Sequence, residues 1–116
     1  MTPQEFFKKD LFADKVGVEL LEIKEGYSKA SLLIKEEHLN AGHRTQGGAL
    51  FTLADLALAA AANSHGALAF SLSSNITFLR SSGPGDILYA EARERYAGRS
   101  TGSVSYTHLR AHETCA

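Results

Sequence analysis

Hydrophobic residues are concentrated in one stretch of the chain, LFTLADLALAAAAN, which covers residues 50–63. From residue 50 to 62 every position except Thr52 and Asp55 is apolar, so the apolar side chains go all the way round a helix instead of forming one stripe. This pattern predicts a long helix enclosed by the rest of the fold. Asp55 carries the only formal charge between residues 46 and 78, and its presence in such a helix requires an explanation.

Most of the remaining segments show the alternation of apolar and polar residues that is typical of strands. A short helix is expected first, capped by Thr2 and running to about Ala13. The predicted strands are VGVELLEI (16–23), YSKASLLIK (27–35), ALAFSLSSNITFL (67–79) and ILYAEARERYA (87–97), with turns at Glu25-Gly26 and at SSGPGD (81–86). The order of elements predicts an α+β fold in which one antiparallel sheet wraps around one long central helix.

Composition limits the possible classes of protein. The 116 residues are 44% hydrophobic and 22% charged, which fits one globular domain. A net charge of −1 and a pI near 6.5 provide no basic field, so nucleic acid is not an expected partner. The N-terminus MTPQEFFKKD lacks an apolar signal core, and no apolar run is long enough to span a membrane. With Cys115 as its one cysteine, the chain has no internal disulfide, and we expect a cytoplasmic protein that makes no membrane contact.

Two glycines, Gly47 and Gly48, directly precede the apolar helix. They would leave unobstructed backbone N–H groups at a helix N-terminus, where a carbonyl oxygen can be polarised. The alternative is that they merely provide a flexible entry into the helix. Asn40 and Gln46 bring amide side chains to the same loop, which favours a functional site.

Asp55 admits two interpretations. It is either a buried or interfacial aspartate satisfied by hydroxyl or backbone groups, or a general base whose pKa is raised by its apolar surroundings. Its helical neighbours Phe51, Leu58 and Ala59 cannot satisfy it. Eight residues separate Gly47 from Asp55, about 12 Å along a helix at ~1.5 Å per residue, so one helix cannot place both at one carbonyl carbon. If both act on one substrate, they come from different subunits of a dimer with two composite sites.

The predicted strand 67–79 carries small polar residues on one face by period-two alternation. These residues are either cross-strand hydrogen-bonding or solvent-exposed groups, or they line a site that holds water or a ligand. They are Ser71, Ser73, Asn75 and Thr77. His43 and His65 lie in a loop and at a helix end, where histidine is usually a surface or capping residue, so no metal site is proposed.

Two segments together, HLNAGHRTQGGALFTLAD (38–55) and NITFLRSSGPGD (75–86), resemble the hotdog-fold acyl-CoA thioesterases, in particular the phenylacetate-degradation branch. The resemblance covers roughly residues 10–104. It implies a hotdog fold that hydrolyses a small or aromatic acyl-CoA to the free acid and coenzyme A. It also implies a homodimer or homotetramer. No cofactor is expected beyond the coenzyme A of the substrate.

The resemblance also implies roles for individual residues. Gly47 matches the glycine whose N–H polarises the thioester carbonyl, and Asp55 matches the carboxylate of the facing subunit that activates water or attacks directly. Asn40 matches a loop asparagine near the thioester, and Ser71 or Ser73 matches a hydroxyl that positions water.

Further residues complete the expected site. Gln46 stands where this branch often has histidine, so it can hydrogen-bond but cannot act as an acid or base near neutral pH. Guanidinium groups suit the phosphates of coenzyme A, although arginines at strand ends and turns are commonly only solvated. The remaining substrate-binding candidates are Gly48, Asn75, Thr77, Arg80 and Arg99, with Arg44 as a further phosphate candidate.

The C-terminal end departs from the family pattern. After GRSTGSV the chain reads SYTHLRAHETCA, which resembles a foreign, translated ending. We therefore predict one hotdog domain over residues 1–104 and a non-native tail over 105–116, with the last family strand missing and a sheet edge exposed. The spacing of His108 and His112, near Glu113 and Cys115, resembles a metal site but falls in this tail.

Two alternatives to hydrolysis are considered. A hotdog module could bind an acyl-CoA or another acyl ligand without turning it over, but a pure binder gains nothing from a carboxylate near an anionic ligand. Enoyl-CoA hydration is less favoured, because those enzymes resemble a D-x(4)-H arrangement and this chain has Ala60 at that position.

Overall fold

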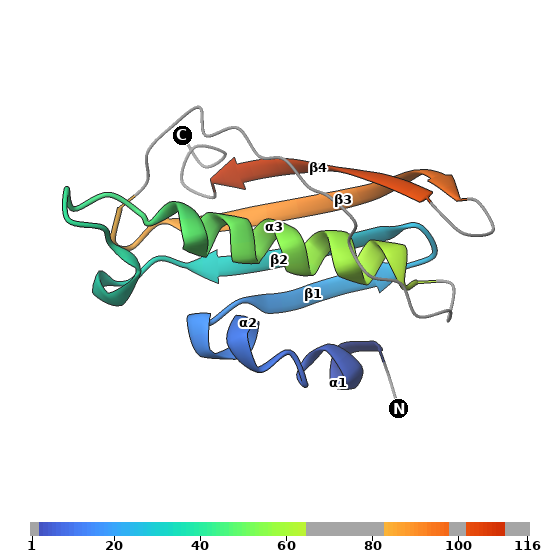
Figure 1. The fold of residues 1–116 in the computed structure, drawn as a ribbon, viewed down its shortest axis with the longest axis horizontal. Helices are drawn as coiled ribbons and strands as arrows, with labels where there is room; N and C mark the ends of the chain where they lie inside the picture. The colour runs from blue at the N-terminus through green and yellow to red at the C-terminus, as the bar shows by residue number, and fades with distance from the viewer. Residues whose placement is uncertain (1–2, 65–82, 98–101, 111–116) are drawn as a thin grey trace.

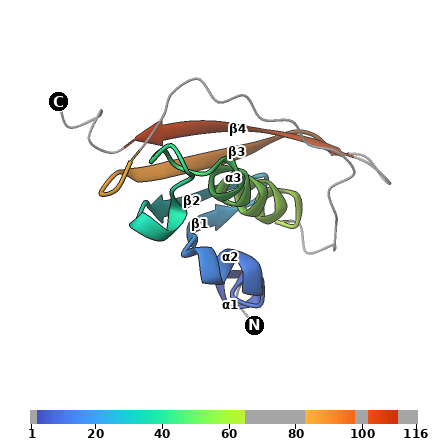
Figure 2. The ribbon, with the colours of Figure 1, turned by 60° about the vertical axis from the view of Figure 1, so that its left-hand side comes forward.

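The computed structural model describes residues 3–64, 83–97 and 102–110 (Figure 1). Within these residues, four strands form one antiparallel sheet in the order β1-β2-β3-β4, and one long helix, α3, crosses a face of it. Two short helices lie beside β1 (Figure 2). The elements are α1 (Pro3–Phe7), α2 (Leu11–Val16), β1 (Glu19–Lys24), β2 (Tyr27–Leu33), a 3-10 turn (Glu36–His38), α3 (Gly47–Ala62), β3 (Ile87–Ala97) and β4 (Gly102–Arg110). This confirms the predicted α+β architecture of one sheet and one long helix.

The face of the sheet that meets α3 is built from small and aliphatic side chains. In β2, Ser28, Ala30 and Leu32 are buried as the alternation predicts, and Ala30 pairs with Ala90 of β3. Small side chains let the helix approach the strands closely. The Ser28 hydroxyl donates to the Ala57 carbonyl oxygen at 2.5 Å, so a buried polar group is satisfied where helix and sheet touch.

The N-terminal helix is shorter than the sequence predicts. It ends at Phe7, and a second helix, α2, begins at Leu11. The break occurs because Asp10 acts as an N-cap, with Oδ1 accepting from the Ala13 N–H at 3.1 Å, instead of staying in a helix interior that suits aspartate poorly. The prediction of one helix to about residue 13 is therefore wrong.

The first strand begins later than predicted because the preceding helix, α2, extends to Val16. Val16 belongs to the end of α2, and Gly17 terminates that helix in the left-handed region at φ 103°. The strand then starts at Glu19 instead of Val16. The following turn is as predicted, with Gly26 at φ 72° between β1 and β2.

Helix α3 begins at Gly47 and presents two different faces. Eight of its residues are buried, including Leu53 and Ala57, but Phe51, Asp55 and Leu58 remain partly exposed. The apolar composition predicts a helix enclosed by the rest of the fold, but the described part of the chain does not cover α3 on all sides. Apolar residues continue onto a face that the sheet does not cover.

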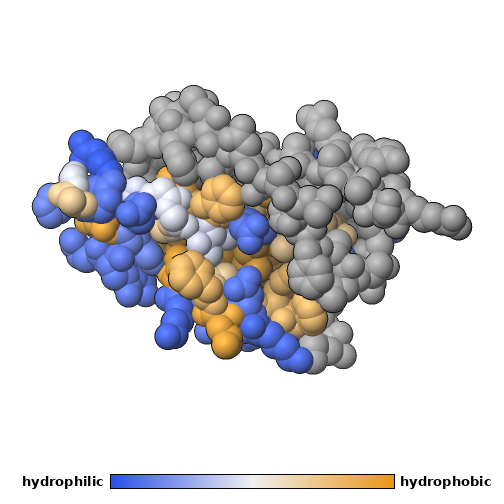
Figure 3. Space-filling model, viewed as in Figure 1, coloured by the Kyte–Doolittle hydropathy of each residue, from blue (hydrophilic) through white to orange (hydrophobic). Residues whose placement is uncertain are grey.

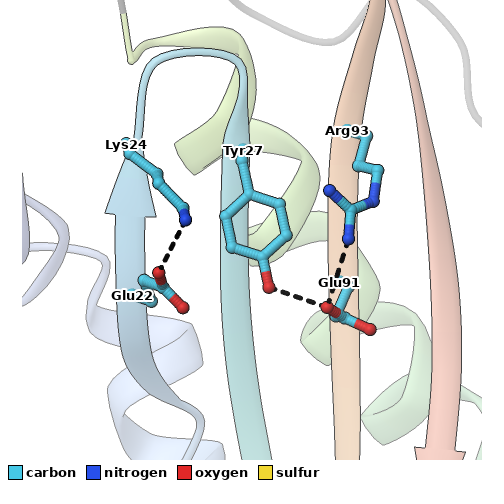
Figure 4. A network of polar contacts seen from close by, with 5 residues as sticks. All are labelled: Glu22, Lys24, Tyr27, Glu91 and Arg93. Atoms are coloured by element: carbon cyan, nitrogen blue, oxygen red, sulfur yellow. Dashed lines mark hydrogen bonds and ion pairs between the residues drawn. The ribbon is translucent and has the colours of Figure 1, made fainter.

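The opposite face of the sheet carries a polar network that does not reach α3 (Figure 4). The Tyr27 hydroxyl donates to Glu91 Oε2 at 2.7 Å, and Arg93 lies 3.7 Å from the same carboxylate oxygen. The Lys24 ammonium and the Arg93 guanidinium lie 5.2 and 4.7 Å from the centre of the Tyr27 ring. These contacts link β1, β2 and β3 across the outer face.

Two predicted segments are only partly described. The strand predicted over 67–79 lies outside the described residues. Strand β4 pairs with β3 and includes residues 105–110, the first half of the predicted non-native tail, while 111–116 lie outside the described residues. The foreign origin of the tail and the missing last strand stay predictions. Within the described ranges, no helix has the length and apolar character needed to cross a membrane.

Candidate active site

The loop before α3 is a closed turn organised by Asn40. Its side-chain Oδ1 accepts from the N–H groups of Gly42 at 2.9 Å and Arg44 at 3.1 Å, and a bridge between Leu39 and Thr45 closes the base of the loop. The Asn40 side-chain oxygen therefore holds the loop together. The side-chain nitrogen makes no hydrogen bond to another described residue, so it can donate to a ligand.

A buried histidine that sequence reasoning missed connects this loop to α2. His38 is 6% exposed; its Nδ1 accepts from the Lys35 N–H at 2.9 Å, which places the proton on Nε2, and Nε2 donates to the Val16 carbonyl oxygen at 2.5 Å. The His38 carbonyl oxygen accepts from the Gln46 N–H at 2.7 Å. No local pattern signals this role, because Val16 is 22 residues away in the chain.

Gln46 is the N-cap of α3. Its Oε1 accepts from the Gly48 N–H at 3.2 Å, so the side-chain oxygen of Gln46 stabilises the start of the helix. The Gly47 N–H makes no hydrogen bond to any described residue, although it lies at the positive end of the helix dipole. Of the two glycines, Gly47 is therefore the one whose N–H is available to a carbonyl oxygen.

Asp55 lies on the half-exposed face of α3, two turns beyond Gly47. Its carboxylate has no hydrogen-bond or ion-pair partner within the described part of the chain. Its neighbours on that face are the apolar Phe51 and Leu58 and the polar Thr52, whose hydroxyl donates to the Gly48 carbonyl oxygen. Burial raises the pKa of Asp55 above its ordinary value, and the negative charge of Asp10 raises it further. The carboxylate therefore holds its proton more tightly than an ordinary exposed aspartate does.

Within one chain the two central groups lie apart. Gly47 and Asp55 belong to the same helix, eight residues from each other, which corresponds to about 12 Å along its axis. A hollow of about 420 Å³ lies between α1, α2, β1 and α3, but it is lined by Ala13, Val18 and Leu56 and by none of the predicted site residues. This hollow is therefore not the predicted site.

Several predicted site residues lie outside the described residues, and their roles stay predictions. Among the described residues, no three histidine, cysteine, aspartate or glutamate side chains are grouped so that they could hold a metal ion. The residues outside are Ser71, Ser73, Asn75, Thr77, Arg80 and Arg99.

An antiparallel sheet that packs against one long helix, with a glycine pair at the helix start, defines a class of protein, the hotdog-fold proteins. The solved structure of the Escherichia coli PaaI protein from the phenylacetic acid degradation operon superposes with a TM-score of 0.89 at 31% identity, covering 93% of this chain and 78% of that one. This confirms the predicted fold class.

Comparison of sequences then gives the family. Residues 45–115 match the thioesterase superfamily. The acyl-coenzyme A thioesterase PaaI of Escherichia coli is 35% identical over 96 residues, which are 83% of this chain and 69% of that protein. An esterase-type protein of Archaeoglobus fulgidus is 42% identical over 97 residues, 84% of this chain, although the match spans only 63% of the archaeal protein's length. The chain belongs to the thioesterase superfamily.

Proposed function

We propose that this protein hydrolyses the thioester of a small or aromatic acyl-CoA, at composite sites formed by two copies of the chain. The observation that carries the proposal is the Asp55 carboxylate. It is half-buried among apolar side chains, its pKa is raised, and it has no partner in the described residues. Leaving such a group unpaired costs stability, which is typical of a residue retained for chemistry.

The composite arrangement is supported by the spacing along α3. Because Gly47 and Asp55 are about 12 Å apart on one helix, a single carbonyl group can meet both only if a second copy supplies one of them. The partly exposed face of α3, with Phe51 and Leu58 beside Asp55, offers an apolar surface for such a copy. A homodimer is the smallest assembly that meets this requirement, and a homotetramer would contain it.

Each group has a defined part in the reaction. The Gly47 N–H of one copy donates to the thioester oxygen, and Asp55 of the other copy accepts a proton from water as that water attacks the carbonyl carbon. The tetrahedral oxyanion then collapses, the C–S bond breaks, and the proton returns to the departing thiolate. The products are the free carboxylic acid and coenzyme A. One oxyanion donor of this kind is worth on the order of 10²–10³ in rate.

Two routes are compatible with this arrangement. Asp55 either activates water, as above, or attacks the carbonyl carbon itself to form an anhydride that water then cleaves. A single turnover in isotopically labelled water detects the second route when water cleaves the anhydride at the aspartyl carbon. Label appears only in the product acid if Asp55 is a base, whereas cleavage of the anhydride at the aspartyl carbon transfers label to Asp55.

Other residues of the predicted site would support these steps. The Asn40 side-chain nitrogen is available to donate to the substrate, while its oxygen fixes the loop. Gln46 positions the start of α3 by capping Gly48. Ser71 or Ser73 would position the attacking water, and Arg80 and Arg99 would contact the phosphates of coenzyme A.

The proposal is tested by measuring free thiol released from acetyl-CoA, a medium-chain acyl-CoA and phenylacetyl-CoA. Asp55→Asn is assayed beside the parent and beside Asp14→Asn, which removes an exposed carboxylate on α2. We expect Asp55→Asn to lower kcat/KM by a factor of about 10² or more and Asp14→Asn to stay near the parent. A folded, oligomeric parent that binds these thioesters and releases no thiol would contradict hydrolysis and support a binding module instead.

A further inference from the structure

We propose that Leu11 and Phe12, the first two residues of α2, are part of the substrate site, where they contact the apolar acyl group of the thioester and thereby set acyl-group selectivity. This inference rests on the proposed thioester hydrolysis and adds residues outside α3 and its preceding loop to that site.

Leu11 and Phe12 are large apolar side chains that are highly exposed to solvent. They are 73% and 68% exposed, more than any other large apolar side chain among the described residues, and they are adjacent in sequence. Figure 3 shows apolar residues gathered over α2 and the neighbouring part of α3 on the helix side of the molecule. Adjacent exposed apolar side chains of this size are typical of binding surfaces.

The local structure holds these two side chains in place. The Asp10 cap fixes the first turn of α2, Gly17 ends the helix, and Ala13, at 2% exposure, anchors α2 in the core. Because successive helical residues are rotated by about 100°, anchoring Ala13 directs Leu11 and Phe12 away from the core. The apolar exposure is therefore a property of a capped and anchored helix.

Helix α2 lies against the helix that carries Asp55. The residue that caps α2, Asp10, is near enough for its charge to act on the Asp55 carboxylate. On α3 itself, the half-exposed side chains of Phe51 and Leu58 flank Asp55. Ala13 and Asp14 of α2 line the same hollow as Leu56, the residue after Asp55, so the start of α2 lies beside the part of α3 that carries the carboxylate.

The acyl group is the part of the substrate that fits this position. The carbonyl carbon that meets Asp55 carries two substituents. One is the hydrocarbon part of the acyl group, and the other is the thioester sulfur, which leads to the anionic phosphates of coenzyme A. Around Leu11 and Phe12, Lys8, Lys9 and Lys15 exceed Asp10 and Asp14 by one positive charge, but a phosphate gains nothing from contact with the two apolar side chains themselves. The uncharged acyl group gains from contact with the two apolar side chains.

The test compares acyl selectivity in matched variants. Leu11→Ala and Phe12→Ala shorten the proposed contact, whereas Leu33→Ala and Phe6→Ala shorten exposed side chains of the same types elsewhere, at 46% and 42% exposure. The readout is kcat/KM for phenylacetyl-CoA divided by that for acetyl-CoA, with the oligomeric state measured by size-exclusion chromatography. We expect this ratio to fall roughly tenfold in the α2 variants, equivalent to ~1.4 kcal/mol, and to change less than about twofold in the controls.

Two results would overturn the inference. One is an unchanged ratio in both α2 variants. The other is dissociation of the oligomer with equal loss of activity on both thioesters, which would make Leu11 and Phe12 a contact between subunits.

Failure of the proposed hydrolysis is recognised separately, because the parent would then release no thiol from any acyl-CoA. In that event the acyl contact is tested by binding. Calorimetry measures the affinities of phenylacetyl-CoA and of free coenzyme A for the Asp55→Asn variant. Loss of the preference for phenylacetyl-CoA on adding Phe12→Ala supports the acyl contact, and an unchanged preference rejects it.

Discussion

The carboxylates of Asp10 and Asp55 repel each other although they belong to different helices. Asp10 is fixed as the N-cap of α2, and its charge, acting after the larger effect of burial, raises the pKa of Asp55 on α3. No cation offsets the Asp55 carboxylate within the described part of the chain. Asp10, which caps α2 where the predicted N-terminal helix is interrupted, thus also raises the pKa of the proposed catalytic carboxylate.

The first prediction concerns this pair. Asp10→Asn removes the charge but keeps a side chain that caps helices equally well. Since the base must be ionised to act, activity falls as the pH drops through the raised pKa of Asp55. Without Asp10 that pKa decreases, so we expect the acidic limb of the kcat/KM profile to move to lower pH. Asp14→Asn is the control, and an acidic limb in the same place for all three proteins would refute the coupling.

The second prediction concerns stability. The folded-state pKa of Asp55 is raised, so its ionisation destabilises the fold as the pH rises through that pKa, and the effect is absent at acidic pH where the carboxyl is protonated in both states. We expect Asp55→Asn to have a higher Tm than the parent at neutral pH, with the difference vanishing below the usual range of aspartate. Thermal unfolding across this range measures it. A difference that is constant with pH would show that the charge is not the cause.

The third prediction concerns His38. His38→Ala leaves the Lys35 N–H and the Val16 carbonyl without their partners, so the free energy of unfolding should fall by about 2–4 kcal/mol. Denaturant unfolding gives the value. His43→Asn is the control, since His43 is exposed and has a φ of 61°, a conformation that asparagine tolerates; its change should stay within about 0.5 kcal/mol. Similar losses in the two variants would contradict a linking role for His38.

The fourth prediction concerns the capping of α3 by Gln46. Gln46→Ala removes the acceptor for the Gly48 N–H and should cost about 1 kcal/mol of stability, whereas Gln46→Ser, which restores a capping oxygen, should recover most of it. Urea unfolding of the three proteins provides the comparison. If serine were no better than alanine, the capping bond would contribute little.

The fifth prediction concerns the outer face of the sheet. Burial, the hydrogen bond to Glu91 and the charges of Glu91 and Glu22 raise the pKa of Tyr27 to about 12, against a smaller opposing effect of Arg93. The resulting stability is present below the ordinary pKa of tyrosine and is lost as the pH rises through about 12. In an ultraviolet titration, Tyr27→Phe should remove the phenolate transition at the highest pH. Retention of that transition would assign it to another tyrosine.

Much of the fold is predictable from local pattern. Strand β3 has the predicted bounds, 87–97, and the turn at Glu25-Gly26 lies where the pattern places it. These elements depend on alternation and on a glycine with positive φ, both of which are local properties. The N-terminal helix is mispredicted because Asp10 can either continue a helix or cap a new one, and the packing of Ala13 in the core favours the second arrangement.

The site was predicted less completely than the fold. Sequence reasoning selected Asp55 and Gly47 and placed them on one helix, which the structure bears out, while their catalytic roles stay predictions. It overlooked His38, because both hydrogen bonds of the imidazole go to backbone atoms that no side-chain pattern reveals. It also did not foresee that the Asn40 oxygen would be used within its own loop.

The sequence by itself determined the long apolar helix, the alternating strands, the glycine pair and the isolated aspartate. Helical and strand periodicity and charge depend only on which residues follow one another along the chain. Tertiary structure alone decided which groups are neighbours. It brought Asp10 near Asp55, joined Val16 to His38, and left Leu11 and Phe12 exposed. These relationships arise when distant segments pack around one core, and the strength of an electrostatic or hydrogen-bonding contact depends on that final distance and burial.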